Sequence, residues 1–253
     1  MKKLTPISFN AGHFNVVDNE KFSQAISLLK ESLACKGGTL FSADNTITWN
    51  KNYSFLRDEH YLEYVKDEST ALVQKSIVWR TYVLDFFMSR ALSVDGDVLE
   101  LGVLDGSTVK FLYGQHGNRL RGRAYYLIDL FGWSDGDTHT KHSSLLDENL
   151  FERVSNTFND YEEVKVLKGD VIDVLPTLDI AKVAFAHIDM NAPEPELFAL
   201  EHLAPLMMKG GCIIFDDYGW WGYCEQKVAI DNYLNERNLQ ILELPTGQGI
   251  LLF

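Results

Sequence analysis

The fold is decided by one stretch, Val98-Leu-Glu-Leu-Gly-Val-Leu-Asp-Gly106. A short apolar run that leads into closely spaced glycines is typical of a buried strand followed by a tight turn. Ser107-Thr108 comes next and can open a helix whose first backbone N–H groups are free. Strand, turn and helix together predict the first unit of an α/β sheet that binds a ligand at the turn.

Four more short apolar runs follow, separated by glycine turns and amphipathic stretches. They are 124–129, 164–167, 183–189 and 212–216. Strands that alternate with helices predict parallel βαβ units. At the end of the chain, two apolar runs flank Pro245-Thr-Gly-Gln248, which predicts an antiparallel hairpin. We therefore predict a Rossmann-like α/β fold: a mostly parallel sheet with helices on both faces and a C-terminal antiparallel hairpin.

The first third of the chain has a different rhythm. Residues 18–34 repeat apolar side chains at spacings of three and four, and residues 70–92 also read as helical. Residues 41–57 are mixed and show no clean period. We predict an N-terminal, mainly helical extension, residues 1–92, and a cofactor-binding catalytic domain, residues 93–253.

Composition limits the function. The chain has 253 residues, 46% hydrophobic content and a formal charge of −13. It can bury a full core, and its negative field disfavours nucleic acid and anionic membrane surfaces as partners. Three cysteines without metal-type spacing fit unpaired thiols in a reducing compartment. With no apolar leader and no run of 18 apolar residues, we expect a soluble, cytoplasmic protein, and a homo-oligomer is left open.

An acidic residue beside the glycine turn limits the kind of ligand that the turn can bind. Glu100 beneath Gly102 and Gly106 favours a sulfonium with an ammonium group over a nicotinamide pyrophosphate, which would prefer three glycines and no carboxylate. Asp129 ends the next strand and suits the two hydroxyls of a ribose. The alternatives are a structural turn at the glycines and a helix cap or solvated loop at Asp129. Ser107 belongs to the same predicted cofactor site.

Three further acids end two later strands. Asp189 closes one apolar run and Asp216-Asp217 closes the next. The carboxyl ends of parallel strands meet at one edge, and carboxylate oxygens are the ligands that Mg²⁺ prefers. Two adjacent carboxylates repel each other unless something positive lies between them. A bound cation explains all three acids together. A solvated turn is an alternative explanation for Asp216-Asp217 taken alone.

Four segments carry a family resemblance: 98–106, Ile128-Asp-Leu-Phe-Gly132, His187-Ile-Asp-Met190 and Gly210-Gly-Cys-Ile-Ile-Phe-Asp-Asp-Tyr-Gly219. In this order, they resemble the macrocin O-methyltransferase family of class I S-adenosylmethionine-dependent enzymes. The resemblance runs from about Asp97 to the C-terminus. It implies the class I methyltransferase fold and a Mg²⁺-dependent O-methyltransferase, often one that acts on sugar hydroxyls of natural products.

The resemblance also assigns roles to residues. It implies that Asp189, Asp216 and Asp217 bind the metal, that Glu100 and Gly102 line the methionine end of the cofactor, and that Asp129 holds the ribose. Asp170 falls where the family contacts the adenine amino group, but a helix cap explains it nearly as well. One position departs from the family: Asn191 stands where a second acid is common.

The implied chemistry is methyl transfer to a hydroxyl that the metal polarises. Candidates for the base are Asp189 itself and the loop histidines His139 and His142. His187 lies inside an apolar run and reads as a buried, hydrogen-bonded strand residue rather than a ligand. Two other functions are weighed, a nicotinamide-dependent oxidoreductase and a catalytically silent nucleoside-binding α/β module. The missing third glycine disfavours the first, and the acidic triad disfavours the second.

Overall fold

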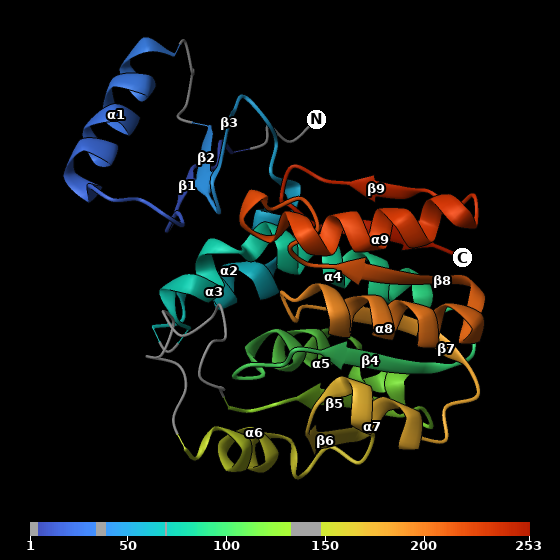
Figure 1. Cartoon of the computed structure of the whole chain (residues 1–253). Coiled ribbons are helices and arrows are strands. Elements are labelled where there is room, and N and C mark those ends of the chain that lie inside the picture. Colours follow the sequence, from blue (N-terminus) through green and yellow to red (C-terminus); the bar gives the residue numbers. More distant parts are fainter. Residues whose placement is uncertain (1–4, 34–38, 69, 133–147) are drawn as a thin grey trace. The chain divides into compact units, whose positions relative to one another are not determined.

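The computed structural model describes residues 5–33, 39–68, 70–132 and 148–253 (Figure 1). It forms two compact units, Met1–Tyr82 and Val83–Phe253. Helix α4 (Val78–Ala91) runs through the division between them.

The first unit combines helices with a small sheet. The helices are α1 (Asn19–Ser32), α2 (Glu59–Lys66), α3 (Leu72–Ser76) and the 3-10 turn η1 (Ser54–Arg57). Asp18 caps α1 by accepting a hydrogen bond from the Lys21 N–H, so the predicted helix begins where its sequence signal begins. The sheet consists of β1 (Phe9–Asn10), β2 (Leu40–Ala43) and β3 (Thr46–Trp49) in the order β1-β2-β3.

This sheet was not predicted, for an identifiable reason. β2 is buried on both faces, so its residues show no alternation between apolar and polar. The only local signal is the Asp44-Asn45 turn, in which both residues have positive φ, as two-residue hairpins require. The Arg80 guanidinium donates to both carboxylate oxygens of Asp44 at 2.7 and 2.8 Å, and this buried ion pair fixes the turn from the start of α4.

The second unit has a seven-stranded sheet in the order β6-β5-β4-β7-β8-β10-β9. Its strands are β4 (Asp97–Leu101), β5 (Tyr125–Asp129), β6 (Val164–Lys168), β7 (Val183–Ile188), β8 (Met207–Phe215), β9 (Ile241–Glu243) and β10 (Gly249–Leu252). β4 to β8 pair in parallel, whereas β10 is antiparallel to both β8 and β9. The predicted mostly parallel sheet and its C-terminal antiparallel hairpin are confirmed.

Helices cover both faces of this sheet (Figure 1). They are α5 (Ser107–Leu120), α6 (Leu150–Phe158), α7 (Val171–Val174), α8 (Pro193–Leu203) and α9 (Cys224–Glu236), with the 3-10 turns η3 (Leu175–Thr177), η4 (Ala204–Leu206) and η5 (Trp221–Tyr223). Residues of α7, α8 and α9 form one buried apolar cluster with the sheet. α5 lies on the opposite face (Figure 1).

The order of strands places the ligand-binding edge. The chain adds β5 and β6 on one side of β4, then crosses to add β7 and β8 on the other. In open α/β sheets, ligands bind at the carboxyl ends of the strands beside such a reversal. Gly102 lies at this reversal of the strand order. A Cβ there would lie 1.9 Å from the carbonyl oxygen of Asp189, so the turn after β4 touches the end of β7.

We expect Gly102→Ala to lower the free energy of unfolding by about 2 kcal/mol or more, because φ is +90° and the new Cβ would clash with backbone. Gly114→Ala in α5 is the matched control. Its Cβ would meet open space, and alanine is the better helix former, so this variant should be as stable as the wild type or more stable. Denaturant unfolding of both variants measures the difference, and equal stabilities would contradict the close approach.

Candidate cofactor and metal site

The turn after β4 is held in a strained conformation. Gly102, Leu104 and Gly106 have φ values of 90°, 50° and 74°, and leucine rarely adopts such a value. Gly106 is the N-cap of α5, and a Cβ there would lie 2.8 Å from the ring of Phe158. Ser107 begins α5 and donates its N–H to Asp105. Strain of this kind persists at sites where a ligand approaches the backbone.

Asp129 holds this turn in place. Its Oδ2 accepts hydrogen bonds from the N–H groups of Val103 at 2.7 Å and Leu104 at 2.9 Å. Its Oδ1 accepts one from the N–H of Phe131 at 2.6 Å. The structure therefore gives Asp129 a bracing role that the sequence did not reveal. A carboxylate oxygen can accept more than one hydrogen bond, so the contact of Asp129 with a ribose stays a prediction.

Glu100 faces into the sheet and lies beside a histidine. It is 2% exposed, and its Oε1 lies 2.8 Å from Nδ1 of His187 on the adjacent strand β7. The hydroxyl of Tyr125 donates to Oε2 at 3.5 Å. Glu100 was predicted to line the methionine end of a cofactor. The structure places its carboxylate beneath the glycine turn, where it is engaged with His187.

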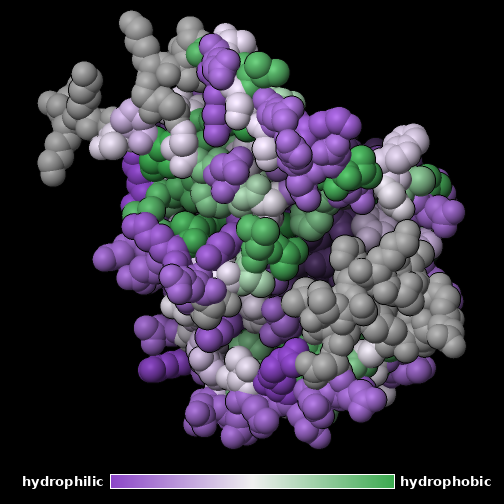
Figure 2. Space-filling view, turned by 90° about the vertical axis from the view of Figure 1, so that its left-hand side faces the viewer, coloured by the Kyte–Doolittle hydropathy of each residue, from purple (hydrophilic) through white to green (hydrophobic). Residues whose placement is uncertain are grey.

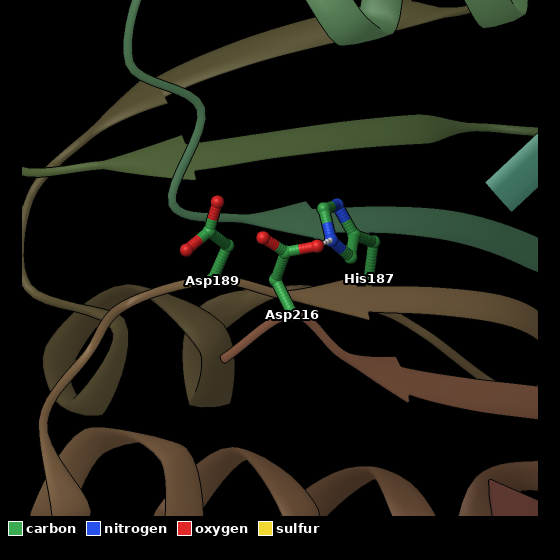
Figure 3. A group of neighbouring side chains, drawn as sticks. All are labelled: His187, Asp189 and Asp216. Carbon is green, nitrogen blue, oxygen red and sulfur yellow. Dashed lines mark ion pairs between the residues drawn. The ribbon is translucent and has the colours of Figure 1, made fainter. Parts of the chain in front are cut away.

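His187 links Glu100 to the acids. Its Nε2 lies 3.5 Å from Oδ1 of Asp216, as the dashed line in Figure 3 marks. Burial lowers the pKa of this imidazole, but the carboxylates of Glu100 and Asp216 outweigh burial and raise the pKa well above its usual value. The prediction of a buried, hydrogen-bonded strand residue is confirmed.

The acids converge as the strand order requires. Asp189 follows β7 and Asp216 follows β8 (Figure 3). Among the residues that the structure describes, one group offers three ligand atoms within 4.8 Å of one another, and it consists of His187, Asp189 and Asp216. Asp217, the third predicted ligand, is not a member of this group. It is partly buried, one residue beyond Asp216.

A fourth acid was missed from the sequence. Glu196 lies in the first turn of α8, is 1% exposed, and accepts the N–H groups of Met190 at 3.3 Å and Asn191 at 2.8 Å on Oε1. Burial raises its pKa to about 8, against the lowering effect of those bonds, and Asp217 and Asp216 add to the rise. An acid in the first turn of a helix is common, so no local pattern singles out Glu196.

The residues at this edge fit a hard divalent cation. Asp189 and Asp216 offer oxygen ligands on neighbouring strands, and Glu196 leaves a buried Oε2 without a hydrogen-bond partner among the described residues. Burial is the main cause that raises the pKa of Glu196, and the negative charges of Asp217 and Asp216 add to the rise. A bound cation would neutralise that charge with the ligand type that it prefers.

The remaining predicted residues lie around this centre or outside the described residues. Asp170 caps α7 by accepting the N–H of Ile172 at 2.9 Å, as its alternative reading proposed, and its contact with adenine stays a prediction. His139 and His142, the candidate loop bases, lie outside the residues that the structure describes. Figure 2 views the side on which the strands end, and the surface around α6 is mainly hydrophilic there.

Two aromatic residues that follow the acidic pair differ in exposure. Tyr218 is buried, its hydroxyl donates to Asp231, and the Lys227 ammonium lies 3.6 Å from its ring centroid. Trp221 is 90% exposed. Tyr218 therefore belongs to the core that supports the acids.

Fold and site together define a class I methyltransferase-like protein. The fold is similar to the O-methyltransferase NovP, with a TM-score of 0.61 and 22% identity over 80% of this chain and 88% of that one. It is also similar to the calicheamicin methyltransferase CalS11, with a TM-score of 0.62 and 15% identity over 94% of each chain. The macrocin-O-methyltransferase (TylF) family matches residues 88–243, and the chain belongs to this family.

Two curated relatives refine the comparison. The chain is 31% identical to demethyldecarbamoylnovobiocin O-methyltransferase of Streptomyces niveus over 156 residues, 56% of this chain and 59% of the relative. It is 30% identical to 8-demethyl-8-(2,3-dimethoxy-alpha-L-rhamnosyl)-tetracenomycin-C 4'-O-methyltransferase of Streptomyces olivaceus over 142 residues, 49% of this chain and 54% of the relative. The match thus spans little more than half the length of either relative. In the described part of the chain, the helices are too short or too polar to cross a membrane.

We expect Glu196→Gln to stabilise the protein increasingly as pH rises. The folded-state pKa of about 8 lies above the ordinary 4.5, so the contribution of Glu196 to stability is full below pH 4.5 and is lost as pH rises to 8. Glutamine keeps an acceptor for the two N–H groups and cannot ionise. The gain over the wild type should grow by about 1 kcal/mol per pH unit in that window, in metal-free buffer.

The matched control is Glu194→Gln, an exposed acid in the same helical turn. It should follow the wild type across the whole pH range. Denaturant unfolding at pH 5, 6, 7 and 8 provides the comparison. A constant difference between Glu196→Gln and the wild type would show that Glu196 ionises in the fold as it does in the unfolded chain.

Proposed function

We propose that this protein is an S-adenosylmethionine-dependent, Mg²⁺-assisted O-methyltransferase that acts on a hydroxyl of a small molecule, a sugar or a glycosylated natural product. The observation that carries the proposal is the convergence of Asp189 and Asp216 beside the strained glycine turn, at the reversal of the strand order. Both curated relatives are named as O-methyltransferases, and the name of the second contains a rhamnosyl group, which supports this class of acceptor.

The cofactor half of the site is the edge formed by β4 and β5. The turn 102–106 presents its backbone to the methionine end, and the negative charge of Glu100 beneath it favours the sulfonium and the ammonium group. Asp129 fixes the turn and offers its carboxylate to the ribose hydroxyls. Asp170 is proposed to reach the adenine end from the start of α7.

The acceptor half is the edge formed by β7 and β8. Asp189, Asp216 and Asp217 would hold Mg²⁺, with His187 and Glu100 fixing Asp216 from below. When bound, the metal supplies a positive charge that lowers the pKa of an acceptor hydroxyl. These side chains would hold the acceptor oxygen at this edge, next to the turn after β4 that is proposed to bind the methyl donor.

The base is assigned by elimination within the described residues. Asn191 stands where the family commonly has a second acid, and an amide cannot accept the proton. Its Nδ2 donates to Oδ1 of Asp189 at 3.3 Å. Asp189 is therefore the proposed proton acceptor, and His139 and His142 are the alternatives.

We expect the wild type to bind S-adenosylhomocysteine in calorimetric titration and to show no binding of NAD. Asp129→Ala should weaken the binding at least about tenfold, because a hydrogen bond to a charged group contributes about 1.5 to 3 kcal/mol and the glycine turn loses its brace. Asp160→Ala, an exposed acid after α6, should bind like the wild type. NAD binding without a response to S-adenosylhomocysteine would point to the oxidoreductase.

We expect chelation by EDTA, and Asp217→Asn, to abolish methyl transfer while S-adenosylhomocysteine still binds, because β4 and β5 hold the cofactor. Asp189→Ala should be at least as damaging, since that residue is both ligand and base. The assay follows S-adenosylhomocysteine release with a panel of glycosylated natural products. Turnover at full rate in excess EDTA would refute the metal role. Cofactor binding with no turnover of any acceptor, with or without Mg²⁺, would favour the silent module.

A further inference from the structure

The turn between β9 and β10 is locked onto the segment that follows the acidic pair. Within the turn, Leu244 N–H donates to the carbonyl of Gln248 at 2.8 Å, and Gly247 N–H donates to the carbonyl of Leu244 at 2.9 Å. Gly219 N–H donates to the carbonyl of Gly247 at 2.7 Å. Gly247 has φ +89°, and a Cβ there would lie 2.6 Å from Trp220. The turn is therefore fixed relative to Asp216.

Gln248 reaches Asp216 from this turn. β10 is antiparallel to β8 with Gly249 opposite Phe215, so the preceding residue, Gln248, lies opposite Asp216. Its side chain is fully buried, and Nε2 donates to Oδ1 of Asp216 at 3.0 Å. A neutral amide holds the carboxylate in this way without adding charge to an already acidic place.

Thr246 completes the hydrogen bonding of the Gln248 amide. Its hydroxyl, also buried, donates to Oε1 of Gln248 at 3.1 Å. With the amide reversed, Oε1 would face the Asp216 carboxylate, and two acceptors would meet without a proton between them. The Asp216 carboxylate, which only accepts hydrogen bonds, thus selects the orientation of the amide, and the Thr246 hydroxyl supplies a donor for Oε1.

His187 holds the same carboxylate oxygen from the opposite side, because its Nε2 lies 3.5 Å from Oδ1 of Asp216. The connected side chains run across four adjacent strands, β4, β7, β8 and β10. In order, they are Glu100, His187, Asp216, Gln248 and Thr246. Asp216 is thereby anchored on both sides through one oxygen, which fixes the plane of its carboxylate.

We infer that Gln248 is a positioning residue for the cation site: by holding Oδ1 of Asp216, it orients this carboxylate towards the point that Asp189 also faces. The inference rests on the proposed metal role of Asp216. Outer hydrogen bonds to ligating carboxylates commonly set metal affinity, and their loss typically costs about 10- to 100-fold. Gln248 belongs to the sequence segment Pro245-Thr-Gly-Gln248, to which the proposed function assigns no role.

The test compares Gln248→Met with the wild type. Methionine has a similar length and cannot donate a hydrogen bond. Titration with Mn²⁺ in the presence of saturating S-adenosylhomocysteine, followed by the spectroscopic signal of free Mn²⁺, should show about 10- to 100-fold weaker binding. S-adenosylhomocysteine affinity without metal should stay at the wild-type value. Raising the Mg²⁺ concentration should restore methyl transfer, which a general loss of structure would not allow.

Gln74→Met is the matched control. Gln74 is buried in the first unit, and its Oε1 accepts a hydrogen bond from the Tyr64 hydroxyl at 3.5 Å. This variant should lose thermal stability but bind Mn²⁺ like the wild type. If Gln248→Met does not fold, Thr246→Val tests the same orientation with less disturbance and should weaken Mn²⁺ binding in the same direction, by a smaller factor.

The outcomes separate the two proposals. A wild type that binds no Mn²⁺ removes the metal role, and with it the assignment of Gln248. A wild type that binds Mn²⁺, beside a folded Gln248→Met or Thr246→Val with unchanged affinity, overturns the assignment of Gln248 alone. Selective loss of Mn²⁺ affinity with intact S-adenosylhomocysteine binding supports it.

Discussion

The site depends on one buried interaction: the imidazole of His187 lies between the carboxylates of Glu100 and Asp216. All three side chains are nearly inaccessible, and a buried carboxylate without a partner is strongly unfavourable. The imidazole provides that partner for both acids, and its pKa rises accordingly. Because Glu100 belongs to β4 and Asp216 follows β8, the same histidine ties the strand beneath the glycine turn to the acidic edge.

A second constraint is the close approach of backbone at the sheet reversal. Gly102 has no Cβ, so the turn after β4 can touch the carbonyl of Asp189, whose N–H donates to Leu101 at 2.7 Å. Asp129 then fixes the far side of the turn through two N–H groups. The backbone positions of the turn after β4 and of Asp189 are therefore set by each other. This coupling brings a methyl donor and an acceptor oxygen to one edge in the proposed reaction.

Several acids lie close together at the edge where β7 and β8 end. Asp216 and Asp217 adjoin each other in sequence, and both raise the pKa of the buried Glu196, which holds the turn at Met190 and Asn191. A cation at this edge would favour ionisation of all the acids around it. Asn191 adds no charge to this edge, and its side-chain amide donates to Oδ1 of Asp189.

Local sequence determined the elements of the sheet and the acids at their ends. The runs that end at Asp129, Asp189 and Asp216 are short, apolar and bounded by turn residues, so each strand and its terminal acid follow from pattern alone. The two apolar runs that flank Pro245-Thr-Gly-Gln248 likewise predicted the antiparallel hairpin. The small sheet of the first unit was not predicted, because β2 is buried on both faces and its residues do not alternate between apolar and polar.

Only the tertiary structure decided which side chains meet. His187 contacts Glu100 from 87 positions away, and Gln248 contacts Asp216 from 32 positions away. Strand order and register set these pairings, and the local pattern of apolar residues predicts neither of them. The role of Glu196 could not be predicted for a related reason. Acids are common in first helical turns, and only the tertiary structure shows that burial and the nearby aspartates raise the pKa of this one. Sequence fixes which chemical groups the edge carries, while the packing of distant strands fixes their charges, their partners and the directions in which they point.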